Sequence, residues 1–181
     1  MAIQLIETVQ QRLNLPALIK ITPDKNEAVK ELPKAPLHQA ALVAVAGALY
    51  KITRTNEGCV RLLLSGKNAN WLTLDEAYGS RLDEVIMKVS NYGIADAAST
   101  EHLMREIAHT CMLVIHEELS GNVSTDAIKE FMSAQRHNIL IYVPTDLQLG
   151  KLLNDRVLDD ESNHMEGPVS NVMHKIEDLF S

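Results

Sequence analysis

The chain has 181 residues, of which 46% are hydrophobic, 23% are charged and only 4% are aromatic. This length suits one domain with a sizeable core, and the composition is that of an ordinary globular protein whose core is built from Leu, Ile, Val, Ala and Met. A formal net charge of −7 argues against nucleic acid and anionic membranes as partners, because both need clustered Lys and Arg.

The beginning of the chain predicts a cytoplasmic location. The stretch MAIQLIETVQQRLN has no basic start and no continuous apolar run, so we expect no secretory signal. The longest apolar run, Ala40 to Tyr50, is shorter than the roughly 20 residues that a membrane span needs. Cys59 and Cys111 lie among apolar residues and are predicted to be reduced core thiols.

Helical spacing of apolar residues predicts three helices in the first third of the chain. The first covers about 3–13. The second covers about 22–32, with Thr22 as its N-cap. The third begins near Leu37 and carries small residues at every fourth position beside a glycine, which lets another backbone approach closely: Ala40, Ala44, Ala48 and Gly47. We expect the third helix to be central.

The middle of the chain contains residues that typically begin or end helices. A break is expected at RTNEG, followed by a short helix in CVRLLLSG. Thr73 and Glu76 have the spacing of a capping box, and Gly79 is placed to end that helix. Ser80 is the predicted cap of the next helix, which Gly93 would end.

A long helix follows from about Thr100 to Leu119. Ser124 is the predicted N-cap of the next helix, which must end before Pro144. Thr145 and Gln148 have the spacing of another capping box.

The acidic stretch DRVLDDESNHMEGP is predicted to be a surface loop, and a last amphipathic helix covers 168–180. These elements predict an all-α fold, an orthogonal bundle of about eight to ten helices. We expect one domain over 1–181, which could consist of two packed halves, 1–68 and 69–181.

The long helix also carries a possible metal motif, because Glu106 and His109 have Glu-x-x-His spacing. His102, His109 and His116 are seven residues apart. On a helical wheel centred on Cys111, the apolar residues of this helix fall within about 80° of Cys111, and the histidines and Glu106 lie on the opposite side.

The wheel favours a solvated face over a di-iron site, since the Glu-x-x-His pairs of di-iron bundles project inward. A metal-dependent enzyme remains an alternative. It would use Glu106 and His109 with a second pair, Glu161 and His164, from the acidic loop. A binding module for a small apolar ligand is a further alternative. No cofactor is predicted.

Residues 74–155 resemble the YidB-like bacterial family of small helical domains of unknown function. The resemblance rests on the order LDEAYGSRLDEVIMKVSNYGI, a long apolar helix, and GNVSTDAIKEFMSAQRHNILIYVPTDLQLGKLL. The matching positions are Gly79, Ser124, Gln135, Ile139 and Pro144, whereas Tyr78 and Val143 replace the family's usual Phe and Leu. The resemblance implies an all-helical domain without established catalytic residues.

Together these patterns favour a non-catalytic helical scaffold or protein-interaction domain that binds itself or another protein. The terminal helices are candidate contact surfaces, through Ile6 and Val9 at one end and Val172 and Ile176 at the other. The histidine face of the long helix, His102, His109 and His116, is a third candidate. The alternative for the terminal helices is that they complete the core.

Overall fold

The computed structural model describes residues 3–21, 35–65, 72–120 and 124–154. Throughout these ranges the regular elements are α-helices or short 3₁₀ segments, and no strand occurs in them. The predicted all-α class is therefore confirmed. The described residues contain eight α-helices and two short 3₁₀ segments, and the predicted helices at 22–32 and 168–180 lie outside these residues. No helix in these ranges is long and apolar enough to cross a bilayer.

The centre of the fold is α2, Pro36–Thr53, as predicted from its stripe of small residues. Its side chains are buried on every side from Gln39 to Tyr50. The small residues permit this, because an added Cβ at Gly47 would lie only 2.8 Å from Cδ2 of Leu149. Helices therefore approach α2 from all around, which an amphipathic surface helix would not allow.

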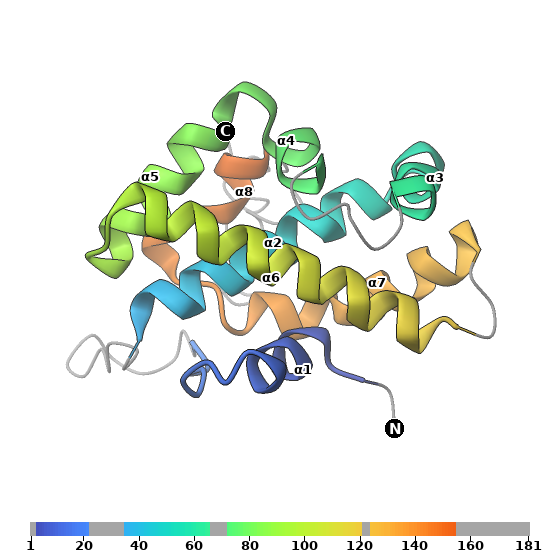
Figure 1. The fold of residues 1–181 in the computed structure, drawn as a ribbon, viewed down its shortest axis with the longest axis horizontal. Helices are drawn as coiled ribbons and strands as arrows, with labels where there is room; N and C mark the ends of the chain where they lie inside the picture. Colours follow the sequence, from blue (N-terminus) through green and yellow to red (C-terminus); the bar gives the residue numbers. More distant parts are fainter. Residues whose placement is uncertain (1–2, 22–34, 66–71, 121–123, 155–181) are drawn as a thin grey trace, which may run out of the picture.

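The other elements surround α2 (Figure 1). The helix α6 crosses the front of α2 in this view, α1 lies along one edge against α6, α2 and α7, and α3 lies at one end beside α7. Their bounds are Leu5–Arg12 (α1), Asn56–Ser65 (α3), Leu72–Tyr78 (α4), Gly79–Arg81 (η2), Leu82–Gly93 (α5), Ala97–Glu118 (α6), Thr125–Leu140 (α7), Thr145–Leu147 (η3) and Leu149–Leu153 (α8).

The buried side chains of the described residues form one hydrophobic cluster. It includes residues from both predicted halves, because α2 packs against α4, α5, α6, α7 and α8. The described part of the chain thus shares a single core that crosses the boundary expected near residue 68.

Three helix starts are fixed by side-chain caps. Ser124 Oγ accepts a hydrogen bond from the Ala127 N–H at 3.1 Å, which confirms the predicted cap of α7. Asp96 Oδ1 accepts from the Ser99 N–H at 2.8 Å and starts α6 three residues before the predicted Thr100. Thr55 Oγ1 accepts from the Gly58 N–H at 3.0 Å, so α3 begins inside the expected break.

Other predicted caps are wrong. Ser80 lies inside η2, and α5 begins only at Leu82 without a side-chain cap. Gln148 has a left-handed backbone, with φ of 47°, and its side chain makes no cap bond to α8. In both cases a turn overrides the local pattern. Glu76, predicted to form a capping box with Thr73, accepts a hydrogen bond from Arg61 at Oε1 at 2.8 Å, and the side chain of Thr73 is not among those that the structure describes.

The two predicted glycine stops behave differently. Gly79 takes a left-handed backbone, with φ of 52°, as expected for a residue that ends a helix. Gly93 remains the last residue of α5, and Ile94 takes the left-handed conformation instead, with φ of 53°. Gly93 is needed for packing, because an added Cβ there would lie 2.5 Å from Cβ of Leu37.

Candidate functional site

The face of α6 opposite the core carries the predicted histidines. His102 and Glu106 are exposed, and His109 and His116 are half-buried. The apolar arc around Cys111 is buried as the wheel predicted, through Met104, Ile107, Ala108, Val114 and Ile115. The buried face is wider than the predicted arc, because Thr110 and Met112 are also buried where α6 meets its neighbours.

The structure does not bring the predicted metal ligands together. Among the described residues, no three His, Cys, Asp or Glu side chains are close enough to hold a metal ion. Glu106 and His109 supply only two candidate ligands, and the proposed second pair, Glu161 and His164, lies outside the described residues. The role of His102, His109 and His116 as a contact surface for a partner stays a prediction.

Both cysteines are free and buried. The Cys59 thiol lies 3.2 Å from the Thr53 carbonyl oxygen, to which it donates a hydrogen bond. Burial raises the pKa of both thiols, that of Cys111 to about 12. A buried thiol with a raised pKa is a poor nucleophile, so the prediction that these residues serve packing agrees with their surroundings.

A shallow apolar notch lies where α3, α6 and α7 meet. Its lining consists of Leu62, Met112, Ile115, His116, Leu119 and Ile128. The enclosed volume is about 10 Å³, room for about one water molecule. Pockets for small ligands enclose roughly 300–1,000 Å³, so this notch could receive part of one side chain but not a metabolite.

The outer face of α3 exposes two large apolar side chains. Leu64 is 82% exposed and Val60 is 42% exposed. They are four residues apart and therefore lie on one face of the helix. Arg61 next to them donates to both Glu57 and Glu76, which gives the apolar pair a charged border.

Another edge of the molecule, at the bottom of the view in Figure 1, holds α1, which belongs to the N-terminal arm, by which we mean residues 3–21. The side chains of Leu5, Ile6 and Val9 are buried against α2, α6 and α7. We call the faces of these three helices that contact the arm the arm groove. The first terminal helix therefore completes the core here, and Ile6 and Val9 are not exposed to a partner. Val172 and Ile176 lie outside the described residues.

A glutamine in the arm groove recognises the main chain of the arm. Gln135 of α7 is 2% exposed. Its Oε1 accepts from the Leu5 N–H and its Nε2 donates to the Ile3 carbonyl, both at 2.9 Å. Both ends of the amide are thus satisfied by backbone groups at the start of α1, which have no partner within that helix.

A second buried glutamine repeats this arrangement at the other end of the arm. Gln39 of α2 accepts from the Ile19 N–H and donates to the Ile19 carbonyl, both at 2.9 Å. Its Nε2 also donates to the Tyr142 carbonyl at 2.9 Å. The Ile21 N–H then donates to the Ile141 carbonyl at 2.7 Å.

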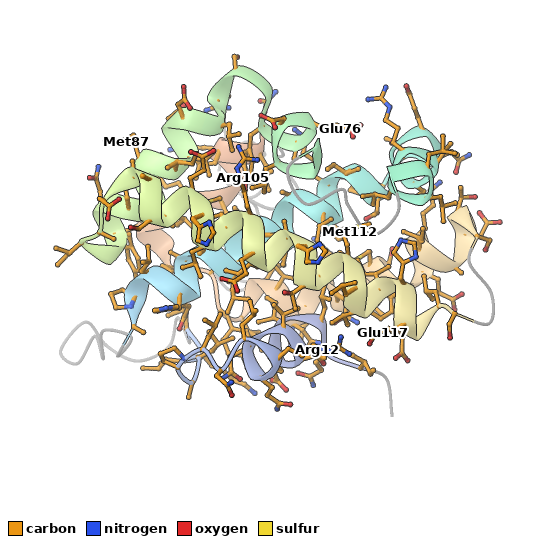
Figure 2. The ribbon with its side chains drawn as sticks, viewed as in Figure 1. Arg12, Glu76, Met87, Arg105, Met112 and Glu117 are labelled. Carbon is orange, nitrogen blue, oxygen red and sulfur yellow. The ribbon has the colours of Figure 1, made fainter. Side chains whose placement is uncertain are left out.

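Charged groups of α1 add two further contacts. The guanidinium of Arg12 donates to Glu117 near the end of α6, and the two side chains point toward each other (Figure 2). Tyr142 donates its hydroxyl to Glu7 Oε1 at 2.9 Å. Burial, with the nearby Glu7 carboxylate, raises the pKa of Tyr142 to about 12.

The two glutamines were not predicted from the sequence as site residues. A signal for Gln135 was present, because the buried face of α7 consists of Ile128, Met132, Gln135 and Ile139. These positions follow helical spacing, so Gln135 interrupts an apolar stripe. No comparable signal exists for Gln39, which lies next to the half-buried turn that opens α2.

Comparisons with protein-family models, with curated proteins and with solved structures gave no match. The resemblance to the YidB-like family stays a prediction.

Proposed function

We propose that this chain is a helical protein-interaction domain whose contact surface is the outer face of α3. The observation that carries the proposal is the exposure of Leu64 and Val60, 82% and 42%, on one face of that helix. Single exposed apolar residues are common on protein surfaces. Two of them on successive turns form a short stripe of the kind that a helix normally buries against another element.

The surroundings of this stripe resemble the layout of an interface. Its border carries the ion pairs of Arg61 with Glu57 and Glu76. Interfaces commonly combine an apolar centre with a charged rim. The notch lies on the opposite side of α3 from this stripe, where Leu62 lines it, and it is too small for a metabolite. A protein partner therefore fits this surface better than a small ligand.

The proposal is tested with a photo-crosslinking amino acid in place of Leu64 in the full-length chain, expressed in its own cell. The matched control carries the same amino acid in place of Met87, which is 51% exposed on α5. Met87 and α3 lie at opposite ends of the view in Figure 2. We expect one discrete adduct of defined mass from position 64 and none from position 87.

The sequence of the adduct distinguishes self-association from a different partner. A Leu64→Lys/Val60→Lys variant, crosslinked through a neighbouring position on α3, should lose the adduct. Folded protein that gives no adduct at position 64, or equal adducts at both positions, would contradict the proposal.

A further inference from the structure

The N-terminal arm is bound to the rest of the molecule as a peptide ligand is bound to a receptor. Its apolar side chains Leu5, Ile6 and Val9 fill the arm groove. Its main chain is held near both ends by the buried side chains of Gln135 and Gln39. These glutamines satisfy backbone groups that lie outside the helix hydrogen bonds of α1, as in complexes where a receptor binds an extended peptide.

We propose that the arm groove is a docking site that also accepts the N-terminal arm of a second copy of this chain, so that two copies can exchange arms. The groove is complementary to this segment in shape and in backbone hydrogen bonding, and Glu117 of α6 forms an ion pair with Arg12 of the arm. The identical segment of another copy makes the same contacts. Exchange of an identical element is a low-cost route to a dimer.

The position of the arm allows it to leave without dismantling the centre of the fold. In Figure 1, α1 lies at the edge of the molecule, and its neighbours are α6, α2 and α7. The helices α4, α5 and α8 pack on α2 without touching α1 through more than marginal contacts. Opening of such an edge element costs less free energy than global unfolding.

Covalent linkage favours the arm of the same chain. Fourteen residues, 22–35, join Ile21 to the first residue of α2. A tether of this kind holds its ligand at an effective concentration on the order of millimolar. The exchanged dimer is therefore expected to be minor at micromolar concentration and to become dominant when the arm of one copy cannot use its own groove.

Complementation between two full-length variants tests the proposal. The first, Leu5→Asp/Val9→Asp, has an arm that cannot enter a groove but keeps the groove intact. The second, Gln135→Leu/Glu117→Arg, keeps the arm intact but leaves the Leu5 N–H and the Ile3 carbonyl unpaired in its own groove and repels Arg12. Only the arm of the second variant in the groove of the first restores every contact.

We expect each variant alone to sediment as a monomer of about 20.1 kDa, and an equimolar mixture to form a dimer of twice that mass. Native mass spectrometry with one variant isotopically labelled would show that the dimer contains one copy of each. The mixture is measured at roughly 100 µM, a concentration at which a dimer with a Kd in the micromolar range would form. Folded variants that stay monomeric at this concentration would overturn the proposal.

A second measurement covers the case in which the first variant does not fold. Loss of its cooperative unfolding transition would show that the arm is an integral part of the core, which also overturns the proposal. If the variant folds, a labelled peptide of residues 3–21 should bind it at least tenfold more tightly than it binds the wild-type chain, whose groove is already filled. The same peptide with Leu5→Asp/Val9→Asp should bind neither.

Discussion

The edge that holds the N-terminal arm and the edge formed by α3 differ in which kind of side chain they bury. At the arm edge, polar side chains are buried and fully used, since Gln39 and Gln135 satisfy backbone groups of residues 3, 5 and 19. At the α3 edge, apolar side chains are left in solvent, with Leu64 exposed over 82% of its surface. The difference shows that the polarity of a residue does not by itself decide whether its side chain is buried. A polar side chain can be buried when its hydrogen-bonding groups are paired.

The largest loss of stability at the α3 edge is expected from a change that prevents α3 from packing on α2. A Cβ at Gly58 would lie 2.1 Å from the Ile52 carbonyl oxygen, a backbone atom that cannot move aside cheaply. Gly58→Ala is therefore expected to lower the free energy of unfolding by about 3 kcal/mol, measured by urea denaturation. Gly79→Ala is the matched control, because nothing lies within 4 Å of an added Cβ there and only the left-handed φ is strained. Its cost should be about 1 kcal/mol, and equal losses in the two variants would contradict the packing argument.

The corresponding change at the arm edge is Gln135→Leu. It keeps the volume of the side chain but leaves the Leu5 N–H and the Ile3 carbonyl without partners. Each unsatisfied buried group costs about 1–3 kcal/mol, so we expect a loss of about 2 kcal/mol in the free energy of unfolding. Gln11→Leu, on the exposed side of α1, should change it by less than about 0.5 kcal/mol.

Hydrogen exchange would sharpen this result. If the glutamine acts on the arm alone, amide protection should fall in α1 and stay unchanged in α5. A uniform loss of protection in both helices would mean that Gln135 supports the whole core instead.

Alkaline pH offers a gentler test of the arm edge. Tyr142 donates to Glu7, and its pKa is raised to about 12 from an ordinary value of about 10. The folded state thus favours the neutral phenol, so this contribution is complete below about pH 10 and is lost as the pH rises toward 12. Tyr142→Phe should lower the free energy of unfolding by about 1 kcal/mol at pH 8.

The difference between wild type and Tyr142→Phe should then shrink between pH 10 and 12. Urea denaturation at pH 8, 10 and 11 measures it. Because every other titrating group is common to both chains, a difference that stays constant over this range would show that folding does not raise the pKa of Tyr142.

These edges also show how far the sequence could be interpreted. The helices followed from apolar spacing, the centrality of α2 from its small residues, and the outward face of α6 from the positions of His102 and Glu106 on the wheel. Such features depend on residues near one another in the chain. The errors at Ser80 and Gln148 arose where a turn decided the conformation, because Ser80 lies inside η2 and Gln148 takes a left-handed backbone.

The candidate surfaces were harder to predict for the same reason. The sequence indicated Ile6 and Val9 as apolar residues on one face, but not whether their own chain would cover them. Gln135 stood in the apolar stripe of α7, yet its partners are the backbone groups of residues 3 and 5, which are some 130 positions away in the sequence. For Leu64, the helix that contains it was predicted from the sequence, but the exposure of its side chain was not.

The smallest effect on stability is expected at the α3 face itself. Val60→Lys/Leu64→Lys replaces side chains that are already 42% and 82% exposed, and a lysine near the C-terminal end of a helix interacts favourably with the helix dipole. The free energy of unfolding should therefore change by less than about 0.5 kcal/mol, as should that of the control Met87→Lys on α5. A loss above 1 kcal/mol in the α3 variant alone would mean that these side chains pack within the chain. If the stability is unchanged in this variant and strongly reduced by Gly58→Ala, then Gly58 holds α3 in place. Val60 and Leu64 would then be free to contact a partner.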